Sequence, residues 1–350
     1  MPLPGRLKIL PGVLFAFFGV IIAILPHGIL SSYHTDTATR VGIYFIAILS
    51  LNLVLGYCGQ ISLGQGALML VGAYTTAILN SRHGWTIVET LPVAFVISFI
   101  IGALLGLPAL RLGGIYLALV TFAFAFAMPQ LPLKFDNFFG GGNGLAFEPK
   151  SALWVYNMTW LLAGLLLIGV WMLVRGRTGR AFRAIRDSET AAVSAGVSLP
   201  MYKVVAFAMS GGIAGLAGSM FAAVNNSFVS PGAFTVLLSL TILIGAAVAG
   251  FGSLYGMLVG ALFVGILPDL SSSIPVIGTD HGLTVVYAGT VILVTFLMPN
   301  GFAGVLRNLV LFLTRSQRQA AVAGAPPPPS PNSQPPHPPS PTPPSAVETV

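Results

Sequence analysis

Charged side chains are scarce in this chain. Asp, Glu, Lys and Arg make up 7% of its 350 residues, whereas hydrophobic residues make up 55%. Soluble domains usually carry about a quarter charged residues. The shortage of charge therefore excludes an ordinary soluble domain and predicts a protein that spans a membrane.

Other absences exclude whole classes of chemistry. A single cysteine, Cys58, rules out an intrachain disulfide and a metal site built from a cysteine cluster. The sequence contains no HExxH, GxSxG or P-loop motif. Its net charge of +7 comes from Lys and Arg gathered in short stretches, which is typical of topology signals. We expect no metal, no cofactor and no nucleic-acid partner, and no hydrolytic activity in the chain itself.

Long uncharged runs set the number of membrane crossings. Val204 to Pro268 holds no Asp, Glu, Lys or Arg in 65 positions. One helix of that length would measure about 98 Å, against a hydrocarbon core of roughly 30 Å, so the run crosses about three times. Turn-forming residues split it, and they also split the run 41–81 near Gly56 to Gln60. Ten spans are predicted, near residues 10–30, 41–55, 61–81, 91–110, 112–133, 154–174, 204–224, 236–250, 254–268 and 283–298.

The basic residues predict the orientation of these spans, because cytoplasmic loops are enriched in Lys and Arg. Arg6 and Lys8 place the N-terminus in the cytoplasm, and ten crossings return the C-terminus there. The loop 175–203, with six basic and two acidic residues, then also lies inside. Arg40 and Arg82 do not fit this count. We expect an all-α polytopic bundle of about ten transmembrane helices, with eight or nine and a re-entrant piece near residues 59–66 as the alternative.

Composition divides the chain into two parts. Residues 1–318 form the predicted transmembrane domain, whose first apolar run we interpret as a retained helix because it is longer than a signal-peptide core. Twelve prolines lie between Pro326 and Pro344. Such a segment cannot bury a core and favours solvated polyproline II, so residues 319–350 are predicted to be a disordered cytoplasmic tail.

Glycine is abundant, with 41 residues. One run, Gly59 to Gly66, has two interpretations: close helix packing, or an unwound segment whose amide groups and neutral side chains contact a solute. A related series follows in the second half, at Gly211, Gly212, Gly215 and Gly218 and then at Gly250, Gly252, Gly256 and Gly260. The pentamer MLVGA occurs at 69–73 and again at 257–261, which suits a bundle made of two related halves.

The basic loop contains a predicted short amphipathic helix, residues 179–196. Phe182 and Ile185 lie on its apolar side, and Arg183 and Asp187 are spaced to pair. The small residues that follow would allow the helix to sit in a groove on another protein. A solvated charged loop is the alternative.

These residues resemble a known family. Thr190, Ala191, Ala192 and Gly196 are similar to the EAA-x3-G loop of ABC-importer permeases, although Thr190 stands where that motif has Glu. The segment 179–203 resembles the corresponding segment in the LivM-like branch of the branched-chain amino acid permeases. Further matching stretches are 52–74, 140–145 and 228–260, so that the resemblance covers roughly residues 40–300.

The resemblance implies a permease subunit that imports Leu, Ile or Val across a bacterial inner membrane. Its partners would be a second permease subunit, two cytoplasmic ATPases and a periplasmic solute-binding protein, with membrane lipid around it. The residues implied for ATPase coupling are Arg180, Arg183, Ile185, Arg186, Asp187, Glu189, Ala191, Ala192 and Gly196. The expected substrate pathway comprises Gly59, Gln60, Ser62, Gly64, Gln65, Gly66 and Asn143.

Three alternative functions remain. Related permeases carry urea and short amides. An ATP-independent channel or facilitator would need no docking helix, and a membrane scaffold displaying the tail would not need glycine runs inside the membrane. The basic loop therefore favours the importer.

Overall fold

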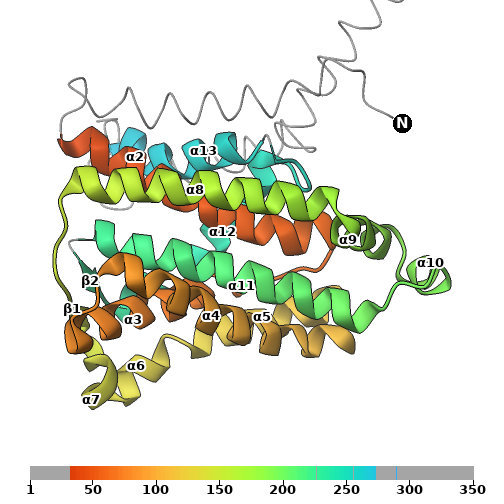
Figure 1. The fold of residues 1–350 in the computed structure, drawn as a ribbon, viewed down its shortest axis with the longest axis horizontal. Coiled ribbons are helices and arrows are strands. Elements are labelled where there is room, and N and C mark those ends of the chain that lie inside the picture. The colour runs from red at the N-terminus through yellow and green to blue at the C-terminus, as the bar shows by residue number, and fades with distance from the viewer. Residues whose placement is uncertain (1–31, 226, 255, 273–288, 290–350) are drawn as a thin grey trace, which may run out of the picture. The chain divides into compact units, whose positions relative to one another are not determined.

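The computed structural model describes residues 32–225, 227–254, 256–272 and 289. The spans expected near 10–30 and 283–298, and the proline-rich tail, lie outside these residues. Within the described part, long helices form the bundle shown in Figure 1: α2 (Ser32–Leu51), continued by a π-helix (Asn52–Tyr57), α3 (Gln65–His83), α4 (Ile87–Gly106), α5 (Ile115–Ala127), α8 (Ala152–Arg175), α11 (Leu199–Val224), α12 (Val236–Ala249) and α13 (Met257–Ser272).

Shorter elements connect the long helices. Strands β1 (Leu145–Ala146) and β2 (Phe228–Val229) pair antiparallel, with Leu145 opposite Val229. The other connecting elements are α6 (Gln130–Lys134), α7 (Asp136–Phe139), α9 (Arg177–Asp187), α10 (Glu189–Ser194) and the 3-10 turns Pro108–Leu110, Gly141–Asn143 and Pro231–Ala233.

A mostly helical membrane fold is confirmed, with the short β1–β2 pair as its strands in the described part, and six segments of that part are long and apolar enough to cross a membrane. They are Thr35–Tyr57, Ile87–Leu110, Ile115–Lys134, Ala152–Arg175, Leu199–Val224 and Pro231–Ala249. Helices α3 and α13 accompany them at positions where spans were expected. The total of ten and the two-halves repeat stay predictions.

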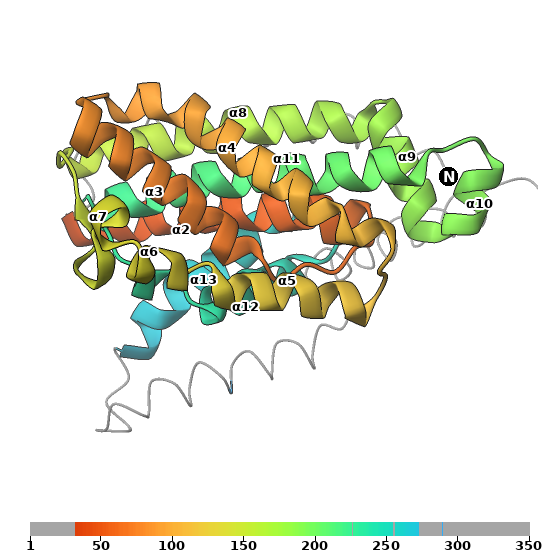
Figure 2. The same cartoon turned by 90° about the horizontal axis from the view of Figure 1, so that it is seen from below.

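The long helices run in alternate directions between two ends of the bundle. Helices α9 and α10 lie at one end, and β1, β2, α6 and α7 lie at the other (Figures 1 and 2). We call these the α9 end and the α7 end. Arg175 to Lys203 lie at the first, and Arg82, Asp136 and Lys150 at the second. A bilayer requires this arrangement, in which charged residues lie at the two ends and apolar helices lie between them.

Glycines let α11 approach α3 and α4 closely. A Cβ on Gly72 of α3 would overlap the carbonyl oxygen of Gly215 of α11, and a Cβ on Gly218 would overlap that of Met69. A Cβ on Gly211 would lie 2.5 Å from the carbonyl oxygen of Ser98 in α4. At these positions the glycines serve close helix packing.

Three expectations about local structure were wrong in detail. Helix α2 begins at Ser32 and not near residue 41, and the break after it falls at residues 58–64. The single helix expected over 179–196 is two helices, because Ser188 adopts an extended conformation and caps α10 by accepting a hydrogen bond from Ala191 N at 3.3 Å. Arg183 donates to the carbonyl of Val174 at 3.3 Å, and no Arg183–Asp187 pair forms in this described segment.

Candidate functional site

The residues expected to couple with an ATPase divide into an exposed and a buried set. Ile185 and Ala192 are 2% and 1% exposed and belong to the hydrophobic core. Phe182, on the same side of α9, packs edge-on against Tyr202 of α11. Glu189 is half-buried. The exposed members are Arg180, Arg183, Arg186, Asp187, Ala191 and Gly196. Among the described residues, one side of the α9–α10 pair packs on the bundle, and the other side is exposed.

Arg186 connects α9 to the end of the first long helix. Its guanidinium donates to the carbonyl oxygen of Gly56, in the π-helix after α2. The side chain also packs on two glycines with positive φ: a Cβ on Gly59 would lie 3.1 Å from Arg186 Cγ, and one on Gly252 would lie 2.7 Å from its Nη1. Only glycine fits this arrangement without strain.

Asn52 extends this contact to the turn between α12 and α13. Its side-chain amide donates to Ser253 O at 3.0 Å and accepts from Gly252 N at 2.7 Å. The nitrogen and the oxygen of this buried amide therefore each have a hydrogen-bond partner. The two partners are 201 and 200 residues away in the sequence. The π-helix, the α12–α13 turn and α9 are consequently joined at the α9 end of the bundle.

A second polar cluster joins α10, α11 and the segment after α2. Lys203 is 4% exposed, and its ammonium lies 2.8 and 2.9 Å from the two carboxylate oxygens of Glu189. It also donates to Ala109 O at 3.2 Å. The amide of Gln60 donates to Glu189 at 3.3 Å. The buried cation is thus paired and hydrogen-bonded, as burial of a charge requires.

The expected pathway segment is unwound and enters the bundle. Residues 59–64 are not helical, and α3 begins at Gln65, beside Ser50 of α2. Ser50 precedes the end of the π-helix at Tyr57 by seven residues, so α3 starts about 10 Å inside the α9 end. Hydroxyl groups already accept two of the amide protons there: Thr121 from Leu63 N at 2.9 Å and Ser239 from Gly66 N at 2.9 Å.

Gln65 links two helices across the bundle. Its side chain accepts from Ser50 at 3.0 Å and donates to Ser210 of α11 at 3.1 Å. The residue is 1% exposed. Ser62 and the glycines at 64 and 66 are buried as well, while Gly59 is exposed. In this conformation the Gln65 amide and the N–H groups of Leu63 and Gly66 bond to the protein, whereas the buried Gln60 Oε1 has no hydrogen-bond partner among the described residues.

The structure brings together part of each predicted set and separates another part. Gly59 and Gln60 of the pathway set contact Arg186 and Glu189 of the coupling set. Asn143 lies at the α7 end, in an exposed 3-10 turn beside β1, away from residues 59–66.

Sequence analysis missed Asn52 and Lys203 as site residues. Each carried a signal: Asn52 is the single amide in the apolar run 41–55, and Lys203 is the last charge before the 65 uncharged residues.

Comparison with known proteins gives consistent matches. The family model described as "Branched-chain amino acid transport system / permease component" matches residues 33–299. The high-affinity branched-chain amino acid transport system permease protein LivM of Salmonella typhimurium is 34% identical over 289 residues, covering 73% of this chain and 68% of the relative. LivM of Escherichia coli is 34% identical over 267 residues, covering 67% and 63%.

More distant similarity extends to other importers. The autoinducer 2 import system permease protein LsrC of Klebsiella pneumoniae is 36% identical over 115 residues, covering 31% of this chain and 33% of the relative. No solved structure gives a significant match. The chain spans about two thirds of the length of the two LivM relatives.

Proposed function

The chain belongs to the family of permease components of branched-chain amino acid transport systems, and from this membership we propose that it is the membrane permease of an ABC importer for Leu, Ile and Val. The family match over residues 33–299 is the observation that carries the proposal. A permease component is a transport subunit and not itself an enzyme. ATP hydrolysis is then the task of partner subunits.

The exposed side of α9 and α10 is the surface we assign to the ATPase. It combines the basic side chains of Arg180 and Arg183 with the small, exposed Ala191 and Gly196. Small residues permit close docking, and the basic ones offer partners for carboxylates. A channel without an ATPase would have no use for such a surface. The full assembly would add a second permease and a periplasmic solute-binding protein, in a bacterial inner membrane.

We further propose that the two polar clusters transmit movement of α9 and α10 to the membrane segments. Arg186 holds the Gly56 carbonyl in the π-helix, and Glu189 holds Gln60, so both contacts lie near the start of the unwound stretch that leads to α3. A displacement of α9 and α10 therefore pulls on residues 56–60 directly. Because the π-helix departs from α-helical i→i+4 bonding, and such segments are frequent at functional sites, it is a natural place for such a movement to be absorbed.

The solute path follows residues 59–66 in this proposal. Residues 59–66 carry no charged side chain, and the buried Lys203 near Gln60 is already paired with Glu189. The carboxylate and ammonium of an amino acid would therefore meet backbone amides and the neutral groups of Gln60, Ser62 and Gln65. Gln60 Nε2 and the Gln65 amide are bonded to the protein in this conformation, so transport requires them to exchange partners. Contacts of this kind are weak and transient, which leaves selectivity to the solute-binding protein.

Concentration-dependent uptake of labelled leucine and urea tests the proposal in cells that carry the whole system. Deletion of the gene is expected to abolish leucine uptake and to leave urea uptake unchanged. Gln65→Leu is expected to lower the maximal rate several-fold with little change in apparent affinity. Loss of urea uptake with leucine uptake intact would instead assign the chain to the amide-transporting relatives.

A further inference from the structure

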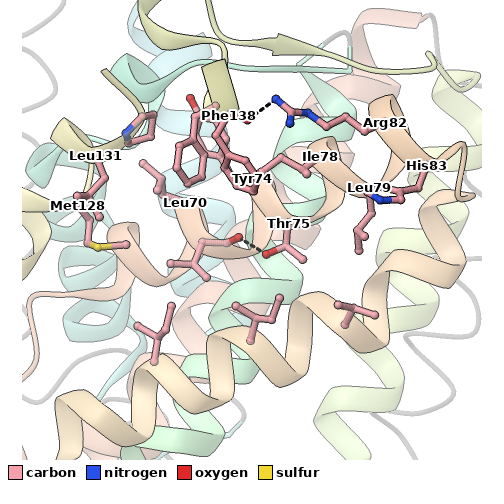
Figure 3. Close-up of a pocket in the computed structure, with 16 residues that line it drawn as sticks. Leu70, Tyr74, Thr75, Ile78, Leu79, Arg82, His83, Met128, Leu131 and Phe138 are labelled. Atoms are coloured by element: carbon pink, nitrogen blue, oxygen red, sulfur yellow. Dashed lines mark hydrogen bonds between the residues drawn. The ribbon is translucent and has the colours of Figure 1, made fainter. Parts of the chain in front are cut away.

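A cavity of about 550 Å³ lies between α3, α4 and the α6–α7 segment (Figure 3). Its wall on α3 is a row of side chains three to four residues apart, from Leu70 through Tyr74 and Ile78 to Arg82. Figure 3 shows these side chains following one another along the helix. None of the residues assigned to the solute path or to ATPase coupling lines the cavity.

The cavity is a groove with the length of one bilayer leaflet. From Leu70 to His83 the helix rises about 20 Å. One leaflet of the hydrocarbon core measures about 15 Å. Its inner end is buried at Leu70, 3% exposed, whereas Arg82 and His83 are exposed at the other end. The groove therefore runs from the middle of the bundle to the charged α7 end.

The margins of the groove open toward the bilayer. Ile97 of α4 and Leu131 of α6 line it and are 38% and 43% exposed. Both belong to segments that are long and apolar enough to cross a membrane. A groove that opens between two such segments opens onto lipid chains.

The lining of the groove is suited to a ligand that has an apolar chain and an anionic head group. Almost all lining side chains are apolar, and Arg82 and His83 stand at the outer end. Arg82 donates through Nη2 to the carbonyls of Asn137 and Phe138 at 2.7 and 2.8 Å, and the guanidinium has further N–H groups to offer. No Asp or Glu lines the groove, so the ammonium of an amino acid would find no counter-charge. Tyr74, 2% exposed, has a hydroxyl without a hydrogen-bond partner among the described residues.

We propose that this groove binds one acyl chain of a membrane phospholipid, with the phosphate at Arg82 and His83. The chain fills the apolar space along α3, and the carbonyl-rich region of the lipid brings hydrogen-bond acceptors near the α7 end. This role also accounts for Arg82, which does not fit the distribution of charge expected from topology alone. Arg82 then lies where a phosphate attracts it.

Native mass spectrometry of the assembled importer tests the proposal. The complex is reconstituted in vesicles of phosphatidylethanolamine and phosphatidylglycerol, re-extracted in mild detergent, and the phospholipid retained per permease chain is counted. Ile97→Trp fills the groove, and Arg82→Gln removes the cation. Val96→Trp, on the same helix but outside the lining, and Lys134→Gln, an exposed cation outside the lining, are the matched controls.

We expect about one retained phospholipid per chain in the wild type and in both controls, and at least a threefold loss in Ile97→Trp and Arg82→Gln. Equal retention in Ile97→Trp and Val96→Trp would overturn the proposal. In a second arm, a photoreactive benzoylphenylalanine at Leu131 is irradiated in native membranes. A cross-link to phospholipid supports the assignment. A cross-link to the second permease subunit would assign the groove to that subunit. Loss of the retained phospholipid when leucine is added would assign it to the solute.

Discussion

Ala191 and Ala192 are neighbours in α10 with opposite surroundings. Ala191 is exposed, and Ala192 is 1% exposed within the hydrophobic core. Ala191→Trp is therefore expected to leave the permease folded and to weaken ATPase binding at least tenfold, because bulk lifts α10 from a groove. Ala192→Trp is expected to destabilise the permease itself by about 1–3 kcal/mol, because it overpacks the core.

Co-purification of the ATPases, together with thermal unfolding of the permease in detergent, separates these two effects. Gly196 is less suitable for the purpose, because its φ of +80° makes any substitution strained. Unchanged ATPase binding by a stable Ala191→Trp protein would contradict the docking surface.

The Lys203–Glu189 pair is asymmetric, and its two halves should respond differently to mutation. The lysine side chain is 5% exposed and the glutamate side chain 43%. Glu189→Ala leaves a buried ammonium without its counter-charge, for which we expect a loss of about 2 kcal/mol. Lys203→Met leaves a carboxylate that water can reach, for which we expect a loss of less than about 1 kcal/mol.

A double-mutant cycle of thermal unfolding measures this difference. The double variant should be no less stable than Glu189→Ala alone, because the methionine removes the unpaired charge. An equal loss from the two single substitutions would show that burial of the lysine does not govern the energetics of the pair.

At the scale of elements, α11 is held by backbone contacts that only glycine allows. Gly72→Ala places a methyl group on the Gly215 carbonyl, so we expect α3 and α11 to separate and the protein to lose about 3 kcal/mol or more. Among the described residues, a Cβ on Gly164 of α8 would meet no atom within 4 Å outside its own stretch of helix backbone. Gly164→Ala should be neutral or slightly stabilising, since alanine is the better helix former. The folded fraction in size-exclusion chromatography measures both.

Sequence predicted the long helices well, because apolar run length and turn residues determine where a chain can cross a bilayer. Helices α8, α11 and α12 begin and end within a few residues of the expected positions. It failed where tertiary contacts decide the local conformation. The π-helix contains Asn52, which bonds to residues 252 and 253. At the start of α3, Ser239 accepts the amide proton of Gly66, and Thr121 accepts that of Leu63 just before the helix.

At the scale of the whole molecule, Gly59 and Gln60 of the predicted solute path contact Arg186 and Glu189 of the predicted coupling set at the α9 end of the bundle. The contacts of Arg186 with Gly56 and of Glu189 with Gln60 span 130 and 129 residues. No local pattern can reveal such a pairing, since periodicity and motif spacing report only on neighbours in sequence. The separation of Asn143 from residues 59–66 escaped prediction for the same reason.

The orientation of this end in the membrane is the prediction on which the importer proposal depends. If α9 and α10 face the cytoplasm, Val193→Cys, whose native side chain is 54% exposed, should resist a membrane-impermeant maleimide in intact cells and react after permeabilisation. Asn137→Cys, at the exposed α7 end, should react in intact cells. The native Cys58 need not be removed: it is 0% exposed, and burial raises its pKa to about 12, so at neutral pH it remains an unreactive thiol. The unmodified protein should therefore stay unlabelled under both conditions. Labelling of Val193→Cys from outside would place α9 and α10 away from any cytoplasmic ATPase, and no coupling role for Arg186 or Glu189 would survive that result.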